Sequence, residues 1–94
     1  MTQEEAKELV RSAIKGTMVD GAEISPLYPV EDEHWFYLTR KDFNPKWACF
    51  EAVVKDGKLL FGLQDDVGWF GESESADETY KAMLEDAGKH EKAM

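Results

Sequence analysis

The chain has 94 residues, of which 43% are hydrophobic and 12% aromatic, and its formal net charge at pH 7 is −9. This length fits a single domain, 1–94, and the apolar content is too high for a disordered chain. Nucleic acids and anionic membrane surfaces require clustered lysine and arginine, so the acidic balance argues against direct contact with either.

The compartment is inferred from cysteine use and from the N-terminal residues. Cys49 is the one cysteine, so no intramolecular disulfide forms, and residues 1–5 are acidic rather than apolar as in a signal peptide. No apolar run approaches the ~20 residues that span a bilayer. We expect a cytoplasmic protein.

A helix is predicted over residues 2–16. Thr2 and Glu5 match a capping box, and apolar residues recur at helical spacing behind them. Gly16 is a typical residue just past a helix end. The region 17–33 is ambiguous: 17–19 and 22–24 form one interrupted strand or two short ones, and Pro26 and Pro29 exclude a central strand over 25–30.

Strands are predicted over 34–40 and within a hairpin at 47–64. The dipeptide Asp56-Gly57 favours a two-residue type I′ turn, which places Lys55 opposite Lys58 and fixes the register. The pairs sharing the core face are then Val54–Leu59, Ala52–Phe61 and Phe50–Leu63.

The segment after the hairpin, 65–72, forms either a further short strand or an extended loop. A second capping box, Ser75 to Glu78, begins a helix predicted over 75–88, which Gly88 ends. The tail 89–94 is expected to be frayed.

These elements predict an α+β fold in the order α-β-β-β-β-α, with an antiparallel meander sheet of three to five strands packed against an N-terminal and a C-terminal helix. The predicted core comprises Leu9, Val10, Ile14, Phe36, Leu38, Phe50, Val54, Leu59, Phe61, Leu63, Tyr80 and Leu84.

Motifs for catalysis, metals or cofactors are absent from the sequence. Nothing places Cys49 beside His34, and a lone strand cysteine is usually a small, half-buried apolar residue. The acids Asp65, Asp66, Glu72 and Glu74 fit a solvated loop better than a calcium site. We therefore expect a chain that is not an enzyme, with no catalytic residue, metal ligand or cofactor.

Two groups of aromatic residues are candidate contact points. Trp69 and Phe70 lie within the stretch 65–78, which has six acids and no base. They either fill the core or form an anchor in an acidic rim, since tryptophan dominates interface hot spots. Trp35, Tyr37 and Trp47 lie on the second face of the sheet, which is either covered by a helix or free for a partner.

The function that these features favour is a small acidic protein-binding module, an inhibitor or adaptor whose partner has a basic surface. Its size and charge are similar to those of phage anti-defence proteins and bacterial immunity proteins, a likeness that rests on no shared motif. The candidate partner-binding residues are Trp69, Phe70, Asp65, Asp66, Glu72, Trp35, Tyr37 and Trp47. The alternatives are a homodimer through the second sheet face and a small-molecule-binding domain with an aromatic-lined pocket between sheet and helix.

Overall fold

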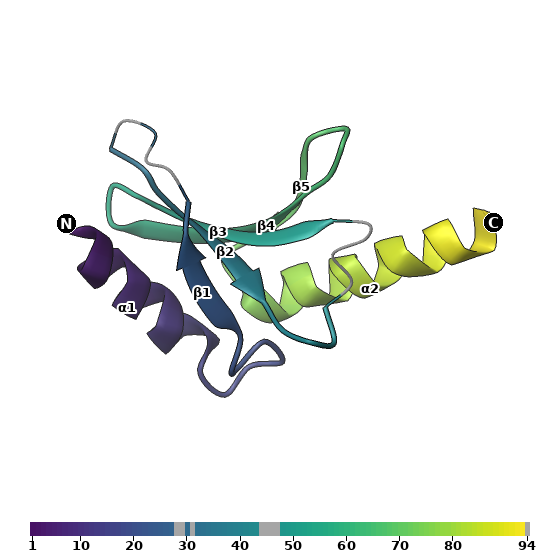
Figure 1. Cartoon of the computed structure of the whole chain (residues 1–94), viewed down its shortest axis with the longest axis horizontal. Coiled ribbons are helices and arrows are strands. Elements are labelled where there is room, and N and C mark those ends of the chain that lie inside the picture. Colours follow the sequence, from purple (N-terminus) through teal and green to yellow (C-terminus); the bar gives the residue numbers. More distant parts are fainter. Residues whose placement is uncertain (28–29, 31, 44–47, 94) are drawn as a thin grey trace.

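The fold is a five-stranded antiparallel meander with one helix before it and one after it (Figure 1). The computed structural model describes residues 1–27, 30, 32–43 and 48–93, with side chains as far as Gly88. The elements are α1 (Gln3–Ile14), β1 (Glu23–Pro26), β2 (His34–Thr39), β3 (Cys49–Lys55), β4 (Lys58–Gln64), β5 (Trp69–Ser73) and α2 (Ala76–Ala93). The strands lie in sequence order, which confirms the predicted α+β meander, and their number is the highest of the predicted three to five.

Helix α1 begins and ends as its sequence predicts. The Thr2 hydroxyl accepts a hydrogen bond from the Glu5 amide, and the Glu5 carboxylate accepts one from the Thr2 amide, so the capping box is complete. Gly16 follows with a φ of 79°, a conformation that glycine adopts readily. Residues 17–21, part of the ambiguous region, form turns, and the strand begins only at Glu23.

The β3–β4 hairpin has the predicted register. Asp56 and Gly57 both have positive φ, 53° and 75°, as a type I′ turn requires. Lys55 pairs with Lys58, and the three predicted core pairs also form, namely Val54–Leu59, Ala52–Phe61 and Phe50–Leu63.

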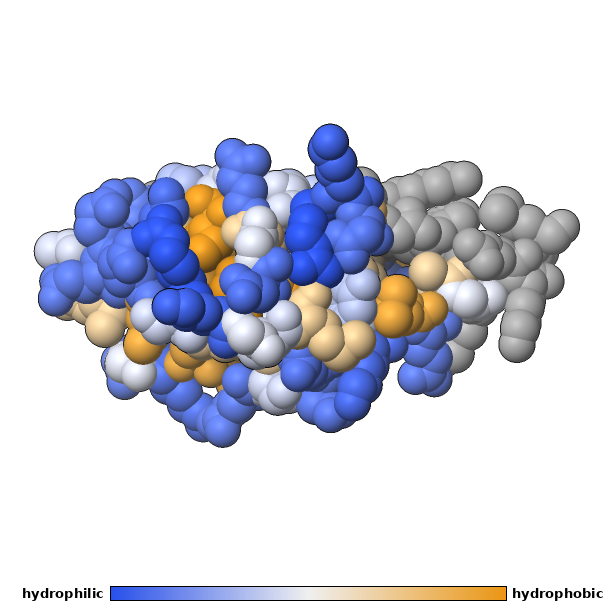
Figure 2. Space-filling view, turned by 90° about the horizontal axis from the view of Figure 1, so that it is seen from below, coloured by the Kyte–Doolittle hydropathy of each residue, from blue (hydrophilic) through white to orange (hydrophobic). Residues whose placement is uncertain are grey.

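Both helices lie on the same face of the sheet (Figure 1). Helix α1 contacts β1 and β2, whereas α2 contacts β4 and β5, so the two helices divide this face between them. The largest fully buried side chains beneath them are Phe36, Phe50 and Phe61. From the helix side, hydrophobic surface appears only in small areas among polar residues (Figure 2). Neither described helix is long and apolar enough to cross a membrane.

Helix α2 corrects three expectations. It continues through Gly88 to Ala93, so Gly88 does not end it and residues 89–93 are helical. Leu84, predicted to lie in the core, is 50% exposed, because it lies on the side of α2 that is turned away from the sheet. Met83 is buried, and so is Thr79, whose hydroxyl donates to the Gly71 carbonyl at 2.8 Å.

A network around Arg40 ties two loops and α2 together. The Arg40 guanidinium donates to the Met18 and Asp20 carbonyl oxygens, each at 2.7 Å, and pairs with the Asp42 carboxylate. The Tyr80 hydroxyl of α2 donates to the same carboxylate at 3.1 Å. These charge-assisted bonds hold the pKa of Asp42 at about 2, below its ordinary 3.8, with the Arg40 hydrogen bond as the main cause.

The two edge strands are short and interrupted. Strand β1 has four residues and ends at Pro26. In β5, Phe70 pairs with Leu63 and Ser73 with Phe61, so the two residues between them oppose Gly62 alone. Gly71 has a φ of 66°, as the first residue of one type of β-bulge requires.

Candidate functional site: the open face of the sheet

The face of the sheet opposite the helices, here called the open face, carries most of the aromatic residues that are predicted to bind a partner. Side chains alternate between the two faces along each strand, so Trp35 and Tyr37 of β2 lie opposite to the buried Phe36 and Leu38. No described helix covers this face (Figure 1). The open face is lined by Trp35, Tyr37, Cys49, Glu51, Val53, Leu60, Gly62 and Trp69.

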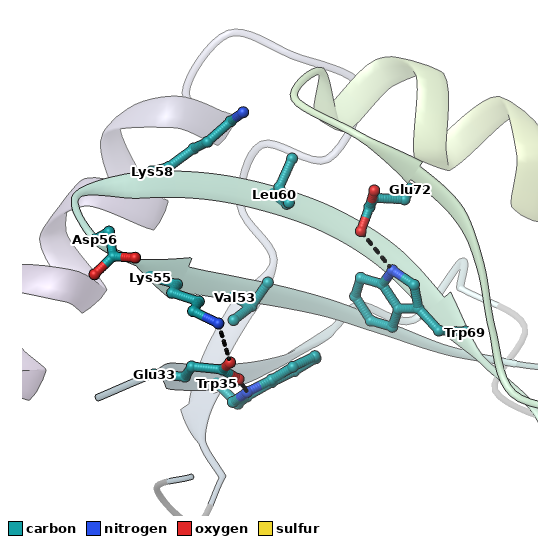
Figure 3. Close-up of a pocket in the computed structure, with 9 residues that line it drawn as sticks. All are labelled: Glu33, Trp35, Val53, Lys55, Asp56, Lys58, Leu60, Trp69 and Glu72. Atoms are coloured by element: carbon teal, nitrogen blue, oxygen red, sulfur yellow. Dashed lines mark hydrogen bonds and ion pairs between the residues drawn. The ribbon is translucent and has the colours of Figure 1, made fainter. Parts of the chain in front are cut away.

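The centre of the open face is a pair of tryptophans. The rings of Trp35 and Trp69 meet edge to face, with centroids 5.2 Å apart and planes at 80°. Each indole N–H donates to a carboxylate, Trp35 to Glu33 at 2.7 Å and Trp69 to Glu72 at 3.0 Å (Figure 3). Both rings are only half-buried, so a fixed aromatic surface faces solvent.

Gly62 of β4 makes room for the Trp69 ring. A Cβ placed on Gly62 would lie 2.1 Å from Trp69 Cζ2, far inside van der Waals contact. Glycine within a strand often marks such a close approach. The bulge in β5 contributes as well, because it returns Glu72 to the same face as Trp69.

A first hollow of about 470 Å³ lies on the hairpin side of the tryptophan pair (Figure 3). Lys55 extends over it and pairs with Glu33 at 3.1 Å. The hydrogen bond from Trp35, and then that from Lys55, lowers the pKa of Glu33. The first hollow is lined by Glu33, Trp35, Val53, Lys55, Asp56, Lys58, Leu60, Trp69 and Glu72.

A second hollow of about 550 Å³ also has Glu33 and Trp35 in its wall. Its other lining residues are Leu27, Val30, Glu51 and Gln64. Glu51 is half-buried, and this burial raises the pKa of its carboxyl group. The described walls of the second hollow therefore contain two carboxylates and neither lysine nor arginine.

Tyr37 lies beside the second hollow as the cross-strand neighbour of Glu51. Burial is the main reason that the pKa of its hydroxyl is raised, with nearby Cys49 and Glu51 adding to the effect. His34 begins β2 opposite Val54, whereas Cys49 begins β3 at the other end of the shared ladder, so the two are not brought together.

The structure divides the candidate contact residues of segment 65–72 between two places. Trp69 and Glu72 lie on the open face, whereas Phe70 is half-buried and packs against the core on the helix side of the sheet. The Asp65 carboxylate accepts from the amides of Val67 and Gly68 at 2.8 and 3.0 Å, so it holds the β4–β5 loop. Asp66 is exposed in that loop, and Trp47 lies outside the described residues.

Two residues that shape the open face are missing from the sequence-based candidates. Glu33 follows two other acids and has the sequence context of a solvated turn, although it bonds the Trp35 indole and Lys55. Gly62 could have been found from the sequence, because a glycine inside a strand often marks a place where another group packs closely against the backbone. In the part of the chain with described coordinates, no group of three or more His, Cys, Asp or Glu is placed to hold a metal ion.

Comparison with known proteins adds no relative: no protein-family model, no curated protein and no solved structure matches this chain. Function is therefore inferred from the open face itself.

Proposed function

We propose that this chain is a protein-binding module, an inhibitor or adaptor, that docks its partner on the open face of the sheet. The observation that carries the proposal is the Trp35–Trp69 pair, which is held by two carboxylates on a face that no described helix covers. Fixed, half-buried tryptophans lose little conformational freedom on binding, which is why they are common interface anchors.

The charge of the chain favours a partner with a basic surface. The net charge is −9, and acids lie around the tryptophan pair at Glu33, Glu51 and Glu72. Such a charge distribution accelerates the encounter with a basic partner and makes the association rate fall as salt is added. It also opposes the approach of a second, equally acidic copy, although the same face is the one on which a homodimer would form.

The test is partner capture with variants that separate the open face from the rest of the surface. Trp69→Ala removes one anchor, and Val67→Ala is the matched control, since Val67 is 95% exposed in the adjoining loop. We expect wild type and Val67→Ala to retain the same protein and Trp69→Ala, with an unchanged far-UV circular dichroism spectrum, to lose it. A photo-crosslinker at Leu60, on the open face, is expected to label that protein, and one at Lys7, on α1, is not.

Retention by the folded Trp69→Ala variant, or crosslinking from Lys7 alone, would contradict docking on this face. Sedimentation velocity on the isolated protein measures whether it forms a homodimer. A dimer that Trp69→Ala dissociates would make a second copy the partner.

A small-molecule ligand is the second candidate function, and the two hollows are the observation that favours it. Their volumes of about 470 and 550 Å³ lie within the range of ~300–1,000 Å³ typical of ligand pockets. A ligand that binds only the folded state raises the melting temperature as its occupancy increases. Compounds that stabilise wild type but not Trp35→Ala would support this function, because Trp35 lines both hollows.

A further inference from the structure

Glu51 differs from the other acids of the open face in its surroundings. It lies in the middle of β3, the central strand, between Tyr37 on one side and Gly62 on the other. The carboxylates of Glu33 and Glu72 each accept a hydrogen bond from an indole, whereas among the described residues the Glu51 carboxylate forms neither a hydrogen bond nor an ion pair. A half-buried carboxylate without a partner is unfavourable for folding, so an external cation is a natural complement.

The second hollow has the other features that a cationic side chain needs. Trp35 supplies an aromatic ring in its wall, and the aliphatic side chain of Leu27 supplies apolar contact for a methylene stem. The hydrogen bond from Trp35 to Glu33 keeps the indole in position. Lys55, the cation paired with Glu33, lines the first hollow and is not among the described residues that line the second.

We propose that the second hollow receives an arginine side chain of the partner protein, with the guanidinium on Glu51 and stacked against Trp35. This rests on the proposed function and names the chemistry of its partner. Arginine fits better than lysine because its planar group stacks on an aromatic ring and donates several hydrogen bonds in one plane, while an ammonium is more strongly hydrated.

A second copy of the chain is a poor source of this arginine. The chain has two arginines, Arg11 and Arg40. Arg40 is bound to the Met18 and Asp20 carbonyls and to Asp42, and Arg11 pairs with Glu8 on its own helix. The guanidinium is therefore expected from a different protein.

The experiment is an NMR titration that needs no knowledge of the partner. The probe is N-acetyl-arginine methylamide, compared at constant ionic strength with the corresponding citrulline and lysine amides. Citrulline has nearly the same shape without the charge, and lysine has the charge without the planar group. The readouts are the Trp35 indole N–H and the Glu51 backbone amide in ¹⁵N–¹H spectra.

Two variants assign the binding to the second hollow. Glu51→Gln removes the charge with little change of volume. Glu23→Gln is the control, because Glu23 of β1 is exposed and also lies on the open face but lines neither hollow. We expect saturable shifts with the arginine probe and affinity at least about tenfold lower in Glu51→Gln, as for the loss of a charged hydrogen bond. Glu23→Gln is expected to bind as wild type does.

Three results would overturn the inference. The first is the absence of a saturable shift of the Trp35 indole signal in wild type, and the second is an affinity for the citrulline probe equal to that for the arginine probe. The third is an affinity for the lysine probe equal to that for the arginine probe, which would indicate a general cation site in place of an arginine site. The proposed function fails separately. If a protein partner depends on Trp69 but places no arginine in the second hollow, docking on the open face stands and the arginine site fails. If the arginine probe binds but no protein partner depends on Trp69, the arginine site stands and the proposed function fails.

Discussion

The contact between Gly62 and Trp69 allows a quantitative prediction about how the open face is built. In the variant Gly62→Ala, the new methyl group would lie 2.1–2.4 Å from three atoms of the Trp69 ring, so the indole or the strand must move. Overpacking of this kind typically costs about 1–3 kcal/mol. In a Trp69→Ala background the obstruction is gone, and alanine is better than glycine within a strand by about 0.5–1 kcal/mol.

The two substitutions are therefore expected to be strongly coupled. Gly62→Ala is destabilising in wild type and stabilising in Trp69→Ala, which gives a coupling energy of about 1.5–4 kcal/mol. The free energy of unfolding is measured by urea denaturation with far-UV circular dichroism, because the fluorescence of Trp69 itself is lost in half of the cycle.

Equal effects of Gly62→Ala in the two backgrounds, within about 0.5 kcal/mol, would refute the reasoning. Such a result would mean that the ring does not rest on Gly62 in solution. The structural origin of the tryptophan pair would then need another account, and the variants proposed for the partner-capture test would have to be chosen afresh.

Three further predictions concern stability. Gly88→Ala is expected to raise the free energy of unfolding by up to about 1 kcal/mol, because Gly88 lies inside α2 and an added Cβ would enter open space; a loss measured by thermal unfolding would restore Gly88 as the helix end. Asp42→Asn is expected to lose under about 1 kcal/mol at neutral pH, since about half of the Asp42 side chain is exposed and solvent screens its pair with Arg40. The pKa of Asp42 is lowered, so this difference is present above pH 3.8 and disappears as the pH falls towards 2, and a constant difference across a pH series would contradict it. Phe50→Ala is expected to cost about 3–5 kcal/mol because Phe50 is 1% exposed, and a loss below about 1 kcal/mol would contradict the core described above.

The sequence predicts best those parts of the fold that short-range chemistry determines. The capping box at Thr2 and the Asp56-Gly57 turn each depend on a few adjacent residues, and both form as expected. The turn then determines the entire β3–β4 register, since one pair of opposed residues sets all the others. The predicted pairing of Phe50 with Leu63 follows from this alone.

The parts that sequence does not predict depend on contacts between distant segments. Whether Trp69 or Phe70 faces the core depends on how β5 pairs with β4, and the bulge opposite Gly62 changes the alternation within five residues. The exposure of Leu84 beside the buried Met83 depends on how α2 is rotated about its axis when it packs on the sheet, which periodicity within the helix does not determine. In the same way, the role of Glu33 appears only when Lys55 and Trp35 are placed beside it.

The short, interrupted edges of the sheet have a consequence for colloidal behaviour. A long flat edge would recruit strands from other molecules and let the sheet grow, but β1 ends at Pro26, which has no amide hydrogen to offer. At the other edge, the bulge at Gly71 and Glu72 interrupts the regular ladder of β5, which makes it a poor template for an incoming strand. Growth of the sheet along its edges is thereby disfavoured, so the proposed docking is expected on the open face and not at the edges.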